Sequence, residues 1–178
     1  MAFINTLHNV IRKSNRDLLY FYATDSNLFF REFKFPSSWS SSVKLLDTID
    51  EHLINLQIDA TDNIYGIAAT QTGDVLYLYS DKSDSINKKK LFSFNSEKYE
   101  LLFPFISKSN NTLHIMYFFQ DLQNPNYWTL FNHYYDGNIW REYCIDTNYT
   151  FPFPSPFTVT FISDFPTIIY LKDDEIYS

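Results

Sequence analysis

The sequence predicts an all-β fold made of repeated units, and three observations carry that prediction. Apolar and aromatic runs, each opened by a polar turn, recur along the chain and begin at Asp17, Asn63, Thr112 and Thr167. Their spacings of 46, 49 and 55 residues are typical of repeats that stack or surround an axis. Aromatic residues make up 20% of the 178 residues, and large rings favour pleated, half-buried strands. With 3 glycines in the chain, the turns depend on Asn, Asp, Ser and Pro.

The clearest unit covers residues 51–97. Residues 52–60 alternate between apolar and polar side chains, which predicts a strand with one face buried and the other exposed to solvent. Residues 64–70 are more uniformly apolar, as in a strand that is buried on both faces. Two further strands are expected at 75–79 and near 91–94. The lysine run 88–90 is expected at a solvated strand edge, where positive charge discourages pairing with other chains.

The remaining units, 1–50, 98–150 and an incomplete 151–178, follow the same strand order. The expected strands are 18–23, 28–35 and 43–49, then 99–107, 113–119, 127–135 and 139–145, and finally 157–163, 167–171 and 176–177. The pair Asp136-Gly137 is a strong hairpin signal between two of them. Residues 3–13 fit either a helix with an apolar stripe or the first strand of the opening unit, and the repeat phase favours the strand.

Units of four antiparallel strands at this spacing resemble the blades of a β-propeller over nearly the whole chain. The resemblance rests on strand order and spacing, because the motifs of WD40, kelch and sialidase repeats do not occur. It implies a single β-repeat domain, residues 1–178, of about three and a half four-stranded antiparallel blades. A β-sandwich is the alternative fold. Because closed propellers need four to eight blades, the resemblance also implies self-association, as in a dimer, or a chain that is part of a longer protein.

Charge and composition exclude several kinds of partner. The net charge of -7 repels phosphate backbones, so nucleic acid is not an expected partner. No apolar run is long enough to span a membrane and no secretion signal is visible, which predicts a cytoplasmic protein without a membrane partner. The single cysteine, Cys144, allows no intrachain disulfide, and we expect it to be a small buried residue.

Motifs for catalysis and metal binding are weak. The four histidines lie far apart in the sequence. Carboxylates cluster at 59/62, 81/84 and 173–175, but these segments are predicted turns, where Asp bonds the local backbone. No nucleophile elbow or phosphate-binding loop occurs. We therefore expect no catalytic residue, metal ligand or cofactor.

Aromatic side chains are the best candidates for recognition. The predicted ligand-binding residues lie at or near predicted loops and strand ends: Trp39, Tyr127, Trp128, His133 and Trp140. Trp39 lies in the polar loop 36–42 and is expected to be the most exposed of them. Exposed rings stack on sugar faces or on apolar patches of a partner protein. The alternative is that these rings fill the space between blades.

These observations predict a non-enzymatic binding or scaffold module that recognises a protein or a glycan through aromatic loops and self-associates to complete a propeller. The alternative is an enzyme of the glycosidase or lyase kind that uses carboxylates in a central channel. A third interpretation is a purely structural part of a larger ring.

Overall fold

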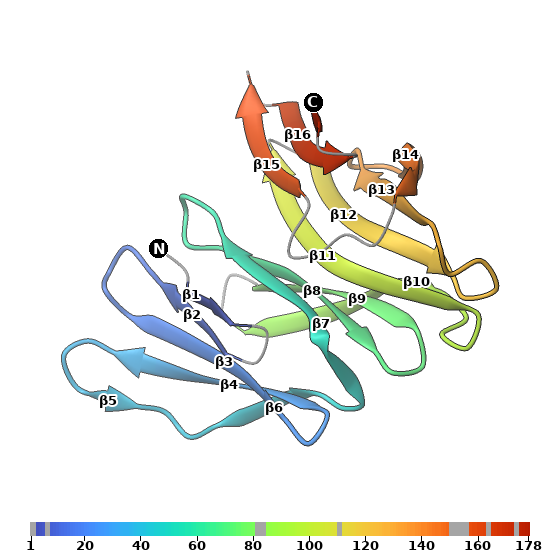
Figure 1. Cartoon of the computed structure of the whole chain (residues 1–178). Helices are drawn as coiled ribbons and strands as arrows, with labels where there is room; N and C mark the ends of the chain where they lie inside the picture. The colour runs from blue at the N-terminus through green and yellow to red at the C-terminus, as the bar shows by residue number, and fades with distance from the viewer. Residues whose placement is uncertain are drawn as a thin grey trace. The chain divides into compact units, whose positions relative to one another are not determined.

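The computed structural model describes residues 3–5, 8–80, 85–109, 112–149, 157–162, 165–172 and 175–178. All the regular structure in these residues is β-strand, arranged in four antiparallel sheets (Figure 1). The fold is therefore all-β with propeller-like blades, as the repeats predict. The chain divides into two compact units, residues 1–96 and 97–178, which we describe one at a time. Among the described residues, no helix is long and apolar enough to cross a membrane.

The first sheet has six strands, two more than the sequence predicts. They are β1 (Phe3–Asn5), β2 (His8–Arg12), β3 (Leu18–Thr24), β4 (Asn27–Lys34), β5 (Ser38–Trp39) and β6 (Val43–Leu46). The order is β1-β2-β3-β4-β5, and β6 also pairs with β4. The extra strands arise because the N-terminal segment forms two short strands, and because the loop containing Trp39 pairs briefly with β4. The strand interpretation of residues 3–13 is thus confirmed for residues 3–5 and 8–12.

The second sheet follows in the order β10-β9-β8-β7. Its strands are β7 (Ile49–Ile58), β8 (Ile64–Thr70), β9 (Asp74–Ser80) and β10 (Ile86–Ser93). Ile49 was expected to end a strand of the first sheet, but it opens β7 instead. The prediction for residues 64–70 is confirmed, because β8 is a central strand buried from Ile64 to Ala69. The three lysines lie exposed on the edge strand β10, as expected.

The first two sheets share one apolar core within residues 1–96. On β3 the side chains of Leu19, Phe21 and Ala23 are buried while their neighbours are half-exposed, which is the period of 2 of a strand with one buried face. They pack in one cluster with Leu56 and Ala68 of the second sheet. One face of the first sheet is consequently covered, and its other face is open.

The third and fourth sheets belong to residues 97–178. The third has the order β11 (Tyr99–Ser109), β12 (Thr112–Asp121), β13 (Trp128–Tyr135), β14 (Trp140–Tyr149). The fourth has the order β15 (Phe157–Ile162), β16 (Phe165–Lys172), β17 (Glu175–Tyr177). The predicted short strand at 176–177 is confirmed as β17. Phe118, Trp128 and Leu130 of the third sheet form a core against Phe157 and Ile168 of the fourth.

Candidate ligand-binding site

The open face of the first sheet carries three cross-strand rows of side chains. Strand pairing places them as follows: Arg12, Leu18, Phe33 and Trp39 in the first row, Val10, Tyr20 and Arg31 in the second, and His8, Tyr22 and Phe29 in the third. Residues that are directly opposite on paired strands share a face of the sheet. We define the aromatic face as His8, Tyr20, Tyr22, Phe29, Arg31, Phe33 and Trp39.

The rings of the aromatic face hold one another in place. His8 stacks on Tyr20, with ring centroids 5.8 Å apart, and Tyr20 stacks on Tyr22 at 5.2 Å. Tyr22 in turn stacks on Phe29 at 5.4 Å. Hydrogen bonds fix the polar tips, because the Tyr20 hydroxyl lies 2.7 Å from His8 Nδ1 and the Tyr22 hydroxyl donates to Ser42 Oγ at 2.8 Å. The result is an ordered ladder of rings with polar groups at its rim.

Trp39 lies at one end of this ladder. Its ring contacts Tyr20 edge-on at 6.2 Å and Phe33 at 5.4 Å, and the Arg31 guanidinium lies 4.7 Å from the Trp39 ring centroid. The side chain is nevertheless 40% exposed, as the sequence predicts. The prediction of a loop is wrong, since Ser38–Trp39 forms β5 against Phe33 and Lys34 of β4.

The segment that follows Trp39 is anchored to β4. The Ser40 amide donates to the Glu32 carbonyl at 2.7 Å, and the Glu32 amide donates to Ser40 Oγ at 2.9 Å. On the other side of the turn, the Phe35 amide donates to Asp17 Oδ1 at 2.9 Å. These bonds hold the exposed Trp39 ring in a defined position, which is what a stacking platform requires.

A second aromatic cluster lies on the third sheet and brings together two of the predicted site residues. His133 and Trp140 come from neighbouring strands, with ring centroids 5.2 Å apart in an edge-on arrangement. Glu142 lies opposite His133 in the strand pairing, with Oε2 3.7 Å from His133 Nδ1. The Tyr117 hydroxyl donates to the same Oε2 at 3.3 Å. The sequence identified His133 and Trp140 but not Tyr117 and Glu142.

Burial sets the protonation of this cluster. Burial raises the pKa of the Tyr117 phenol far above its usual value, and the Glu142 carboxylate raises it further, so the phenol stays protonated. Burial also lowers the pKa of His133, an effect that Glu142 opposes. The cluster therefore presents a neutral imidazole, a phenol and one carboxylate. A hydrolytic site of the usual glycosidase kind uses two carboxylates.

The remaining predicted site residues, Tyr127 and Trp128, are adjacent in the sequence but differ in exposure to solvent. Tyr127 precedes β13 and is 47% exposed. The expectation of a surface ring at Trp128 is wrong, because Trp128 is the first residue of β13 and is 2% exposed within the core. Alternation along the chain turns one ring outward and the next inward.

The sequence carries a signal for the aromatic face within two predicted strands, outside the predicted site residues. Tyr20 and Tyr22 alternate along predicted strand 18–23, and Phe29, Arg31 and Phe33 alternate along predicted strand 28–35. A strand with apolar residues on one face and rings with polar tips on the other indicates an open aromatic surface. The register that brings Arg31 beside Trp39 is a long-range property of the fold.

Asp59 of the 59/62 pair serves the local backbone, as expected, whereas Asp62 bonds to Ser14, 48 residues away in the sequence. Asp59 accepts hydrogen bonds from the amides of Thr61 and Asn63, and Asp62 accepts the Ser14 amide at 2.9 Å. Burial raises the pKa of Asp59, but the hydrogen bonds outweigh it and lower the pKa to about 2. The 81/84 pair, and Asp173 and Asp174 of the third group, lie outside the described residues. Within those residues, no group of three or more His, Cys, Asp or Glu is placed to hold a metal ion.

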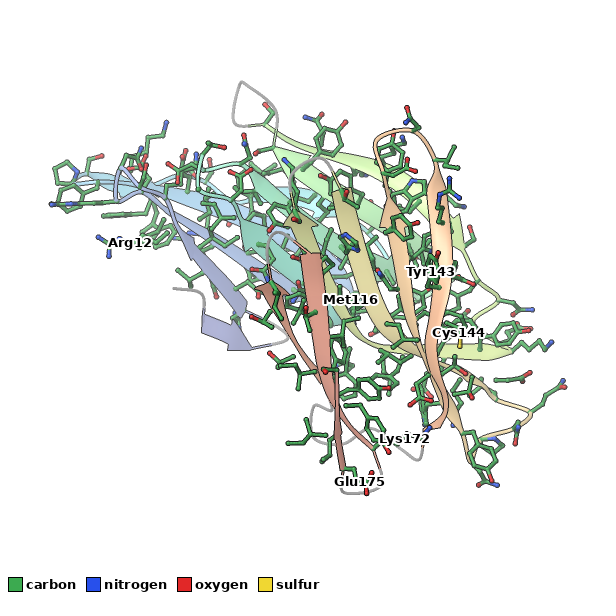
Figure 2. The ribbon with its side chains drawn as sticks, turned by 90° about the horizontal axis from the view of Figure 1, so that it is seen from above. Arg12, Met116, Tyr143, Cys144, Lys172 and Glu175 are labelled. Atoms are coloured by element: carbon green, nitrogen blue, oxygen red, sulfur yellow. The ribbon has the colours of Figure 1, made fainter. Side chains whose placement is uncertain are left out.

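Cys144 is exposed on the edge strand β14, so the prediction that it is buried is wrong (Figure 2). It lies opposite Phe131 in the strand pairing, on the same face as Glu142. Burial raises the pKa of its thiol, as do the carboxylates of Asp146 and Glu142. A thiol with a raised pKa is a poor nucleophile at neutral pH, which argues against a catalytic role.

Comparison with known proteins supports the fold and leaves the family open. No protein-family model matches the chain, and no curated protein sequence matches it. A solved structure described as a bifunctional GH43-CE protein of Bacteroides eggerthii is similar, with a TM-score of 0.51 and 11% identity over 98% of this chain. GH43 is a family of five-bladed β-propellers. The chain spans 24% of the length of that protein.

Proposed function

We propose that this protein is a non-enzymatic glycan-binding module and that the aromatic face of the first sheet is its binding site. The observation that carries the proposal is the exposed Trp39 ring, fixed at the end of a stacked ladder and bordered by Arg31 and tyrosine hydroxyls. Sugar rings present apolar C–H faces and peripheral hydroxyls, so a site for them combines flat rings with polar groups at the rim.

The chemistry of the face favours binding over hydrolysis. Glu32, the one carboxylate residue in strands β2–β6, pairs with Leu19 and therefore lies on the face opposite Trp39. The aromatic face supplies a guanidinium group, which donates hydrogen bonds, and phenol oxygens, which accept a hydrogen bond from a sugar hydroxyl while their own protons are engaged. The similarity of the fold to a structure described as a bifunctional GH43-CE protein supports glycans as the ligand class to test.

The experiment is a glycan array followed by calorimetric titration of the best oligosaccharide. Trp39→Ala is expected to weaken binding about tenfold or more, because truncating a central aromatic anchor costs more than about 1 kcal/mol. Tyr127→Ala is the matched control, since this ring is similarly exposed but lies in the other unit. Its affinity should equal that of the unsubstituted protein.

Two results would contradict the proposal. One is an array on which no glycan binds. The other is a titration in which Trp39→Ala binds as tightly as the unsubstituted protein while Tyr127→Ala does not, which would move the site to the loop before β13.

A further inference from the structure

The open face of the first sheet is positively charged as well as aromatic. Arg12 and Arg31 occupy strand positions on it, and Arg12 points away from the ribbon into solvent (Figure 2). Arg16 lies in the turn between β2 and β3, with its guanidinium 5.6 Å from the centre of the Phe35 ring. Three of the four arginines in the chain are therefore on or beside this face, although the net charge of the protein is -7.

These three arginines lack carboxylate partners within the described part of the chain, whereas other cations have them. The fourth arginine, Arg141, lies 3.5 Å from Asp136. On the covered face of the same sheet, Lys13 and Lys34 both lie within 4 Å of Glu32, at 3.9 and 3.5 Å. The exposed guanidinium groups of Arg12 and Arg16 are thus available to an anion from outside, whereas Arg31 is half-buried and its buried Nε has no hydrogen-bond partner.

The spacing of these groups favours an extended ligand. Arg12 and Trp39 stand at the two ends of one cross-strand row, three strand spacings apart, which is about 14 Å. A single sugar does not reach across that distance, so a ligand that contacts both ends is an oligomer.

We infer that the ligand is an acidic glycan, an oligosaccharide whose sugars carry carboxylates, as uronic acids do. This inference rests on the proposed function of the aromatic face and names its ligand class. A sugar ring stacks on Trp39, and its carboxylate meets a guanidinium group, which matches carboxylate geometry with two parallel N–H donors. The net charge of -7 acts most strongly against double-stranded DNA, which carries one negative charge per about 1.7 Å of its axis, and less against a short acidic oligosaccharide.

The test compares oligogalacturonate with the same oligomer after methyl esterification, which keeps the sugars and removes the charge. We expect the esterified form to bind about tenfold more weakly or worse, because hydrogen bonds to a charged group are stronger than those to a neutral group. Arg12→Gln should weaken binding of the charged oligomer about two- to fivefold and leave the esterified oligomer unchanged, since this arginine is exposed. Lys89→Gln removes an exposed charge from β10 in the same unit and should have no effect.

The outcomes separate this inference from the proposed function. Equal binding of the charged and esterified oligomers, both lost in Trp39→Ala, would overturn the acidic class and keep a glycan site. If neither oligomer nor any neutral glycan binds, both proposals are overturned. Tighter binding of a single-stranded oligonucleotide than of oligogalacturonate, again dependent on Trp39, would overturn the glycan in favour of nucleic acid.

Discussion

The effects of truncating Trp39 and Trp128 on stability should distinguish an exposed ring, which we propose contacts the ligand, from a ring buried in the core. Trp128→Ala removes a side chain that is 2% exposed and packed with Phe118 and Leu130. Truncation of a buried Trp costs about 3–5 kcal/mol in free energy of unfolding. Trp39→Ala removes a ring that is 40% exposed and contacts Arg31, Tyr20 and Phe33. At the lower end of their usual ranges, as suits exposed side chains, a cation–π contact and two ring pairs are together worth about 1.5–2 kcal/mol.

The assay is urea unfolding followed by far-ultraviolet circular dichroism, with tryptophan fluorescence as a second probe. The variants should differ by about 2 kcal/mol, which is about thirtyfold in the unfolding equilibrium constant. Because Trp39 and Trp128 belong to different compact units, tryptophan fluorescence of Trp128→Ala that also carries Trp140→Phe comes from Trp39 and reports whether residues 1–96 keep their own transition. Equal destabilisation by the two variants, or a Trp128→Ala protein within about 1 kcal/mol of the unsubstituted one, would refute the assignment of Trp128 to the core.

Three further predictions concern stability. Gly73 and Gly137 both have positive φ, 84° and 97°, but an added Cβ at Gly73 meets the Phe94 carbonyl and one at Gly137 meets nothing within 4 Å. Gly137→Ala should therefore cost about 1–2 kcal/mol and Gly73→Ala clearly more in urea unfolding. Asp59→Asn should remove pH dependence between about 4 and 2, because a pKa lowered to about 2 contributes stability that is lost as the pH falls through that value. Thermal unfolding at each pH measures it, and an unchanged acid limb would contradict it. His114→Gln should flatten the dependence of stability on pH between pH 7 and 5. Burial lowers the pKa of His114 in the folded protein, so the unfolded state binds more protons below about pH 6.5 and the free energy of unfolding decreases as the pH is lowered. A variant profile as steep as that of the unsubstituted protein would contradict this.

The strand pattern of this chain was predictable because the pattern of apolar and polar residues along a strand is a local property. In β8 the run from Ile64 to Ala69 is apolar at every position, and the structure buries every one of these residues. The extra strands of the first sheet were not predictable in the same way. Ser38 and Trp39 have no strand periodicity of their own, and they become β5 only because their backbone meets Phe33 and Lys34. Pairing with a neighbour, not local sequence, creates that strand.

The candidate site shows the same division between local and long-range information. The exposure of Trp39 followed from its polar neighbours in the sequence. The burial of Trp128 beside the exposed Tyr127 depended on where β13 begins, and a shift of one residue reverses the face of every side chain. The pairing of His133 with Glu142 and the approach of Tyr117 depend on register across three strands. No spacing in the sequence reveals such contacts.

The aromatic face is built in a way that makes rings useful for binding rather than only for stability. A sheet face with loosely held exposed rings pays rotamer entropy when a ligand immobilises them, at about 0.5–1.5 kcal/mol for each side chain. Here the His8, Tyr20, Tyr22 and Phe29 rings are already stacked, and two of their polar tips are hydrogen-bonded. Arg31 is likewise held between its cross-strand neighbour Tyr20 and the Trp39 ring. Because this order exists before a ligand arrives, the proposed binding of an oligosaccharide to this face would cost less conformational entropy than binding to a flexible surface of the same composition.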